Sequence, residues 1–100
     1  MILYNVTIKI IPAIKDRWID YMKDVHIPEV MATQQFSSVR VSHLLEQNEE
    51  EGITFVYQYT CDNLEQYKNY IADYAPALRE DLISKFKDQF VSFRTVMEVM

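Results

Sequence analysis

The sequence WIDYMKDVHIPEVMAT, residues 18–33, joins the end of one amphipathic helix to a second and shorter helical turn. Pro28 has no backbone N–H and disfavours helical backbone angles at the residue before it, so this stretch predicts a bend near Ile27. A bend leaves the last carbonyl groups of the first helix without partners inside that helix. The imidazole of His26 then either bonds to one of these carbonyls or stands free in a cleft.

Upstream of this stretch, residues 2–10 predict a strand that is buried on one face. Apolar and mostly polar residues alternate with a period of two, and the apolar set is Ile2, Tyr4, Val6, Ile8 and Ile10. Pro12 ends this strand, and the apolar spacing becomes helical from about Ile14. The apolar members that share one side of this helix are Ile14, Trp18, Tyr21, Met22 and Val25. We therefore expect a surface helix that lies on a sheet.

Downstream, two alternating runs at residues 36–45 and 53–60 predict a hairpin around an acidic turn that ends in Gly52. Asp62, with Glu65 three residues later, is typical of a capped helix start, and the apolar spacing stays helical to Tyr74. Pro76 interrupts this helix. A further helical piece carries Leu78, Leu82, Phe86 and Phe90, and residues 91–100 alternate as a last strand.

The predicted order is strand, helix, strand, strand, helix, strand, which indicates an α+β fold. Right-handed crossovers over an antiparallel sheet place the first and third strands in the centre and the second and fourth at the edges. This is the ferredoxin-like βαββαβ arrangement with a four-stranded sheet. The chain contains no repeat, low-complexity tract or linker, so residues 1–100 are expected to form a single domain.

Composition excludes several classes of partner and site. The net charge is −5, which argues against nucleic acid, because binding to phosphate backbones needs clustered Lys and Arg. Cys61 is the single cysteine and Gly52 the single glycine, so neither a disulfide, a zinc box nor a glycine-rich phosphate loop is expected. No signal-peptide pattern opens the chain and no apolar run is long enough for a membrane span. We expect a cytoplasmic protein without a membrane partner.

One face of the predicted sheet is neither fully polar nor a proper core. Taking the more apolar side of each strand to face the helices, the other side collects Asn5, Thr7, Lys9, Ser38, Arg40, Ser42, Gln58 and Arg94, with Leu3, Leu44, Val56 and Val96. A second copy of the chain could cover this face through an isologous two-fold interface. The alternative is a solvated sheet face, which antiparallel sheets tolerate.

His26 is the leading candidate for acid–base chemistry, because an ordinary imidazole titrates near neutral pH. Glu29 lies three residues further on and could orient the ring. The alternative is a structural role in which the ring bonds to a free carbonyl at the helix end. Tyr67, Tyr70 and Tyr74 form a stripe at helical spacing that serves either as core or as a pocket for a planar ligand.

The chain resembles an uncharacterised bacterial family of small single-domain proteins over essentially its whole length. The residues that carry the resemblance are Tyr4 to Thr7, Trp18 and Met22, His26 to Thr33, Ala75 to Arg79, and Phe93 to Thr95. That family is similar in turn to the dimeric α+β barrel superfamily, which includes antibiotic-biosynthesis and haem-degrading monooxygenases. The resemblance implies a homodimer whose two sheets face each other, with a cleft in each subunit between sheet and helices.

The resemblance does not extend to haem chemistry. Haem-degrading members combine an Asn on the first strand with a Trp and a His elsewhere, whereas here only Asn5 matches and Trp18 lies on the first helix. We therefore expect no cofactor. Cofactor-independent oxygenation of an aromatic substrate needs only a shaped apolar pocket with a few polar groups. Trp18, Tyr21, His26 and Tyr70 are compatible with such a pocket.

Two functional hypotheses remain open at this point. In the first, the protein is a small monooxygenase-like or isomerase-like enzyme that acts on an aromatic or planar metabolite. His26 then donates or accepts the proton, Glu29 orients it, and Asn5 or Arg94 fixes an anionic or carbonyl oxygen. In the second, the protein is a non-catalytic ligand-binding or assembly module. A cavity of several hundred cubic ångströms with convergent polar groups would favour the enzyme, and a filled interior the module.

Overall fold

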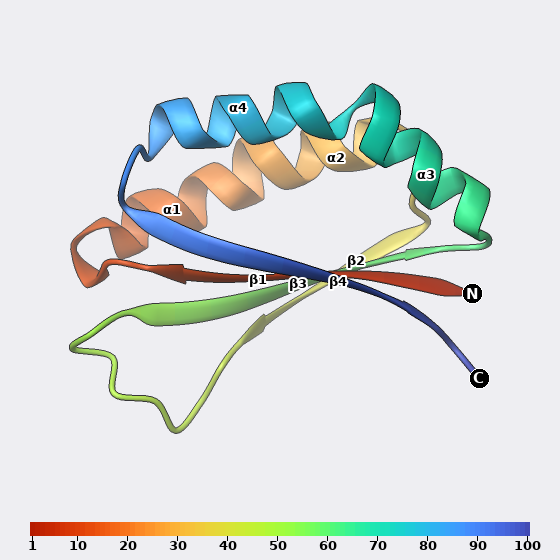
Figure 1. The fold of residues 1–100 in the computed structure, drawn as a ribbon. Coiled ribbons are helices and arrows are strands. Elements are labelled where there is room, and N and C mark those ends of the chain that lie inside the picture. Colours follow the sequence, from red (N-terminus) through yellow and green to blue (C-terminus); the bar gives the residue numbers. More distant parts are fainter.

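The computed structural model describes residues 1–100 and has two layers, with all of the helices on one face of a four-stranded antiparallel sheet (Figure 1). The predicted α+β ferredoxin-like fold is confirmed. The elements in chain order are β1 (Ile2–Ile10), a 3-10 turn (Pro12–Ile14), α1 (Lys15–Tyr21), a π-helical turn (Met22–His26), α2 (Ile27–Ala32), β2 (Ser38–His43), β3 (Ile53–Cys61), α3 (Leu64–Asp73), α4 (Ala75–Lys85) and β4 (Phe90–Glu98). None of these helices is both long enough and apolar enough to cross a membrane.

The strand order in the sheet is β2-β3-β1-β4, so β1 and β3 are central as predicted. β1 pairs along its whole length with both neighbours, and Ile2 lies opposite Cys61 on one side and Glu98 on the other. The chain therefore begins in the middle of the sheet and ends at its edge, with both termini at the same end of the molecule (Figure 1).

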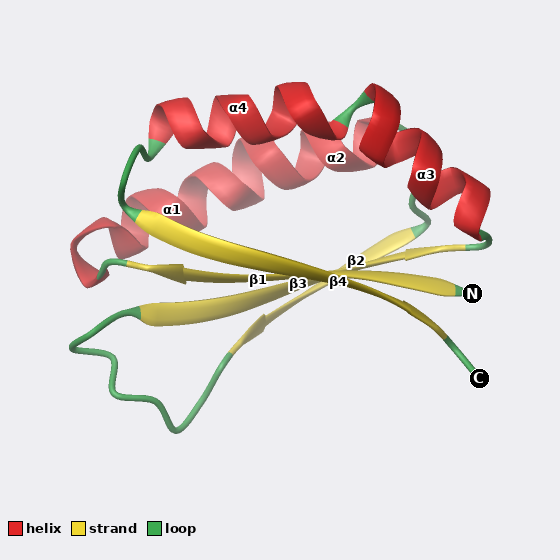
Figure 2. Cartoon of the chain, viewed as in Figure 1, coloured by secondary structure: helices red, strands yellow, loops and turns green.

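The hydrophobic core lies between the sheet and the helices, and the loops stay at the ends of the two layers (Figure 2). All five alternating apolar residues of β1 are buried, as their period of two predicts. Trp18 of α1 and Phe86, which directly follows α4, are fully buried, and the centroids of their rings lie 5.0 Å apart. The indole Nε1 of Trp18 donates a hydrogen bond of 2.8 Å to the Tyr57 hydroxyl, which ties α1 to β3.

The predicted bend at Ile27 is wrong, because the backbone stays helical there. Ile27 has φ −61° and ψ −46°, and its N–H bonds to the carbonyl of Met22, five residues back. The wider π-helical turn shifts the hydrogen-bond register by one residue just before Pro28, which has no N–H to donate. α1, the π turn and α2 therefore form one continuous helical rod, and His26 is the last residue of its irregular turn (Figure 1).

Two other boundaries differ from the sequence prediction. The cap of α3 is Asn63 and not Asp62: the Asn63 side chain accepts a 3.0 Å hydrogen bond from the Gln66 N–H. The Gln66 side chain in turn accepts from the Asp62 N–H at 2.9 Å, so the capping box begins one residue later than predicted. Phe90 opens β4 and does not belong to the preceding helix, which ends at Lys85.

The register of β4 corrects the prediction for one face of the sheet. Arg94 lies directly opposite Val6, and Val96 opposite Tyr4, and residues opposite each other in an antiparallel pair share a face. Arg94 and Val96 therefore face the helices and not the open side. The open side of β4 instead carries Val91, Phe93, Thr95 and Met97. The prediction failed because the apolar residues of β4 occur on both of its faces.

Candidate functional site

A small cavity lies between the sheet and the helical layer and opens partly to solvent. Its volume is about 20 Å³, close to what one ordered water molecule needs. It is lined from below by the sheet and from above by the π turn and the helices α2, α3 and α4. The lining side chains are Tyr4, Val6, Ile8, Met22, His26, Val30, Tyr57, Tyr59, Tyr70, Arg79, Leu82 and Arg94.

His26 enters this cavity from the end of the π turn. Its Nδ1 atom is buried and has no hydrogen-bond partner in the protein. Burial lowers the pKa of His26 to about 4, and the nearby positive charge of Arg94 acts in the same direction against a smaller opposite effect of Asp81. The imidazole is therefore uncharged at neutral pH. Of the two predicted alternatives, the structure shows no bond from Nδ1 to a helix-end carbonyl, and the ring lines a cavity that opens partly to solvent.

Four tyrosines supply hydroxyl groups around the cavity. Burial raises the pKa of Tyr57 to about 12, and it also raises the pKa values of Tyr59 and Tyr70. All three phenols are thus protonated at neutral pH. The rings of Tyr4 and Tyr70 have centroids 5.8 Å apart and belong to the hydrophobic core. The tyrosine cluster consequently serves as core and as cavity wall at once, but it draws on the strands more than on the predicted helical stripe.

Two arginines complete the polar part of the lining. Arg79 on α4 is half-buried, and its Nη2 donates a 3.1 Å hydrogen bond to the Tyr4 hydroxyl. Arg94 reaches the cavity from β4, on the helix side of the sheet. Sequence reasoning missed Arg79. The available signal was its spacing, since it lies three residues before the buried Leu82 on the same face of α4.

The structure brings together only part of the predicted site. His26, Tyr70 and Arg94 line the cavity. Trp18 is fully buried on α1 and does not line the cavity, although its indole donates a hydrogen bond to Tyr57, which does. Asn5 lies opposite Gln58 and Thr95 on the open face of the sheet, away from the cavity.

Glu29 and Tyr21 also lie outside the cavity. Glu29 is exposed and makes no hydrogen bond to His26, so it does not orient the ring in this structure. Partial burial raises the pKa of Tyr21, and the negative charges of Glu29 and Asp81 add to this effect. The Tyr21 ring packs edge-on against Phe86, with centroids 5.4 Å apart.

A second hollow lies between the helical rod and the β2–β3 edge of the sheet. It is an open, mostly apolar groove of about 430 Å³. Its lining residues are Ile19, Met22, Lys23, Ile27, Val39, Val41, Ser42, His43, Phe55 and Tyr57. Met22 and Tyr57 line both hollows and therefore separate the groove from the His26 cavity.

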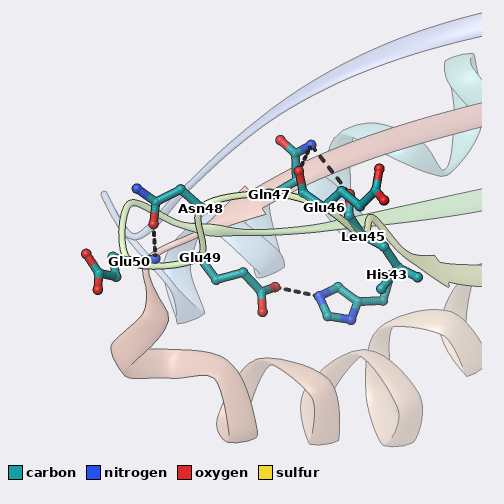
Figure 3. A network of polar contacts seen from close by, with 7 residues as sticks. All are labelled: His43, Leu45, Glu46, Gln47, Asn48, Glu49 and Glu50. Atoms are coloured by element: carbon teal, nitrogen blue, oxygen red, sulfur yellow. Dashed lines mark hydrogen bonds and ion pairs between the residues drawn. The ribbon is translucent and has the colours of Figure 1, made fainter.

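The acidic turn between β2 and β3 forms its own polar network at the surface (Figure 3). His43 and Glu49 are joined by the one ion pair of the structure, with Nε2 and Oε2 2.6 Å apart. The Asn48 side chain accepts a hydrogen bond from the Glu50 N–H. Both ends of the ion pair are more than a third exposed, so it contributes little to stability. No group of three or more His, Cys, Asp or Glu side chains comes together in a way that could hold a metal ion.

Known proteins resemble this chain in sequence family and in fold. The family profile described as Domain of unknown function (DUF4286) matches residues 1–100. The chain belongs to this family. A search of curated proteins found no match to this DUF4286 member. The predicted membership of an uncharacterised family with this fold is confirmed.

Solved structures similar to the DUF4286 chain share its fold at low sequence identity. An ethyl tert-butyl ether d (ethd) family protein from Bacillus halodurans has a TM-score of 0.69 and 14% identity, with 100% of each chain covered. A candidate antibiotic biosynthesis monooxygenase from Deinococcus radiodurans has a TM-score of 0.68 and 16% identity over 100% of this chain and 93% of that one. A dimeric ferredoxin-like protein from an uncultured marine organism has a TM-score of 0.68 and 18% identity over 100% and 95%.

Proposed function

We propose that this DUF4286 member is a homodimeric enzyme that binds a small planar metabolite between its sheet and helices and uses uncharged His26 as the proton acceptor. The proposal treats residues 1–100 as one domain, places the protein in the cytoplasm and assigns it no cofactor. The observation that carries the proposal is the buried Nδ1 of His26, which lines a cavity and lacks a protein partner.

An unpartnered buried nitrogen is costly, so it calls for a partner from outside the chain, and a group of a bound ligand would supply one. Leaving one polar group buried and unsatisfied costs about 1–3 kcal/mol, and most buried polar groups in proteins do have partners. The low pKa of His26 keeps the ring uncharged, so it can accept a hydrogen bond or a proton from a group that enters the cavity. Tyr70 and Arg94 are the other predicted residues that lie close enough to contact the same group.

The homodimer is supported by the open face of the sheet. Val91 and Phe93 on β4 are 68% and 62% exposed, and Met97 is 41% exposed. Together with Leu3 and other apolar side chains of this face, they form a surface that a second copy would cover. The similar marine protein is described as dimeric. Asn5 and Arg40 lie on this face and would contact the second copy in the proposed dimer.

One observation favours the second hypothesis, a non-catalytic binding module. The His26 cavity measures about 20 Å³, far below the several hundred cubic ångströms that hold a complete small-molecule ligand. An enzyme with this geometry must therefore admit only one group of its substrate, or must widen the cavity when the substrate binds. A module would keep the cavity closed and use the same residues for packing.

The enzyme and the non-catalytic module differ in whether a bound ligand is converted to product. Planar aromatic metabolites that bind the full-length chain by ligand-observed NMR would be assayed for conversion by the wild type and by His26→Gln. For an enzyme we expect His26→Gln to reduce kcat by about a hundredfold or more while KM stays within about threefold. His43→Gln is the matched control, because it changes the other histidine at a surface ion pair. Ligands that bind equally well to both proteins without conversion would support the module and overturn the enzyme.

A further inference from the structure

We infer that the ligand of the His26 cavity carries a carboxylate group, which Arg79 and Arg94 hold at the mouth of the cavity beside His26. The inference rests on the proposed function and adds the chemical class of the ligand. It assigns Arg79 a binding role and gives Arg94 a specific partner.

The first observation is that both arginines keep unused hydrogen-bond donors at the cavity, since no Lys or Arg of this chain forms an ion pair. The chain has 15 Asp and Glu against 10 Lys and Arg, yet its one ion pair joins His43 to Glu49 at the surface. Arg94 makes no side-chain hydrogen bond, and Arg79 uses one N–H toward Tyr4 out of the five that a guanidinium offers. Two guanidinium groups with free donors thus line the same small cavity.

The second observation is the balance of charge around His26. The charged groups beside the cavity come from two elements, Arg94 from β4 and Arg79 and Asp81 from α4, and the tyrosines of the cavity wall are uncharged. Asp81 is exposed and forms no ion pair with either arginine. The net charge beside the cavity is therefore positive, and an incoming anion would meet two cations and a neutral imidazole.

The third observation is size. A volume of about 20 Å³ holds about one water-sized group, so at most one carboxylate oxygen enters it, and the rest of a planar ligand must remain at the open mouth. A planar guanidinium can donate two parallel hydrogen bonds to a carboxylate, which an ammonium group cannot. The carboxylate would also bring an acceptor and a negative charge close to the imidazole, where it would favour uptake of a proton on His26.

Benzoate and benzamide test the inference, because they have nearly the same shape and differ in charge. Each would be titrated into the isotope-labelled full-length chain at neutral pH and constant ionic strength, with backbone and Arg side-chain N–H signals recorded by NMR. We expect benzoate to shift the side-chain signals of Arg79 and Arg94. We expect Arg79→Gln and Arg94→Gln each to weaken benzoate binding by about tenfold or more and to change benzamide binding by less than about twofold.

Matched variants guard against loss of folding. Arg17→Gln makes the same change in charge on α1, outside the cavity, and should leave benzoate binding unchanged. Arg79→Lys and Arg94→Lys keep the charge but lose the planar fork, so their affinity for benzoate should fall between those of the wild type and the Gln variants. The Lys variants decide the question if a Gln variant fails to fold.

Three results would overturn the carboxylate inference. Equal binding of benzoate and benzamide, unaffected by either arginine variant, would refute it while leaving a ligand site at His26 intact. Displacement of benzoate by inorganic phosphate at lower concentration would assign the arginines to phosphate instead. Absence of any benzoate-dependent shift up to ~50 mM would remove the anion site; if benzamide also left the His26 signals unchanged, the proposed function would fail with it.

Discussion

Because His26 is buried as a neutral ring, the free energy of unfolding should depend on pH. Its pKa is about 4 in the folded chain against an ordinary value of 6.5, so the unfolded chain takes up a proton first as the pH falls. The contribution of the neutral ring is complete above pH 6.5 and is lost as the pH falls toward 4. The shift corresponds to about 3 kcal/mol at most.

Urea unfolding of the wild type and of His26→Gln at several pH values between 7 and 4 measures this contribution. Carboxylates titrate in the same range in both proteins, so only the difference between them reports on His26. We expect the wild type to lose about 2–3 kcal/mol more than the variant over this range. Equal losses would mean that the imidazole is well solvated in the folded chain.

Single-residue chemistry was only partly predictable from the sequence. His26 could be identified because a proline two residues later marks an irregular helix, and the irregularity does bring its ring to a cavity. Arg79 was missed: its spacing from Leu82 places it on the inward face of α4, but spacing alone does not distinguish an arginine that lines a cavity from one that reaches solvent. For Glu29, a spacing of three residues suggests contact with His26 on an α-helix, but its side chain is exposed and forms no hydrogen bond to the ring.

At the scale of elements, the start of α3 offers a direct test of a boundary that sequence and structure assign differently. We expect Asn63→Ala to destabilise the chain by about 1 kcal/mol, because it removes the acceptor for the Gln66 N–H. Asp62→Ala should change stability by less than about 0.5 kcal/mol, because only the backbone N–H of Asp62 takes part in the capping box. Thermal or urea unfolding compares the two, and a larger loss for Asp62→Ala would restore the predicted cap.

Most elements were predictable because each buries one face with a clear period. β1 and β3 alternate with a period of two, and α1 carries its apolar residues on one side, so their identities and the strand order follow. The last strand was harder, since Phe90 and Val96 lie on one face and Val91, Phe93 and Met97 on the other. With apolar residues on both sides, the sequence could not indicate which face meets the helices. The pairing of β4 with β1 in the structure shows which face of β4 meets the helices.

At the scale of the whole molecule, the proposed dimer is tested by its oligomeric state in solution. We expect the wild type to sediment at twice the 11.9 kDa mass of one chain. Phe93→Glu places a charge in the middle of the exposed apolar face of β4 and should yield monomers at the same concentration. Ile83→Glu is the matched control, because Ile83 is 53% exposed on the opposite, helical side. A monomeric wild type would contradict the proposed dimer.

The central position of β1 has a consequence for the order in which the sheet assembles. β1 pairs on one edge with β3, which ends at Cys61, but its other edge waits for β4, which ends at Glu98. In the interval, a nine-residue strand with a buried apolar face has one row of backbone groups unpaired. Such an edge is a template for pairing with another chain. We therefore expect partly folded chains in which β4 has not yet docked to be the species most prone to misassembly.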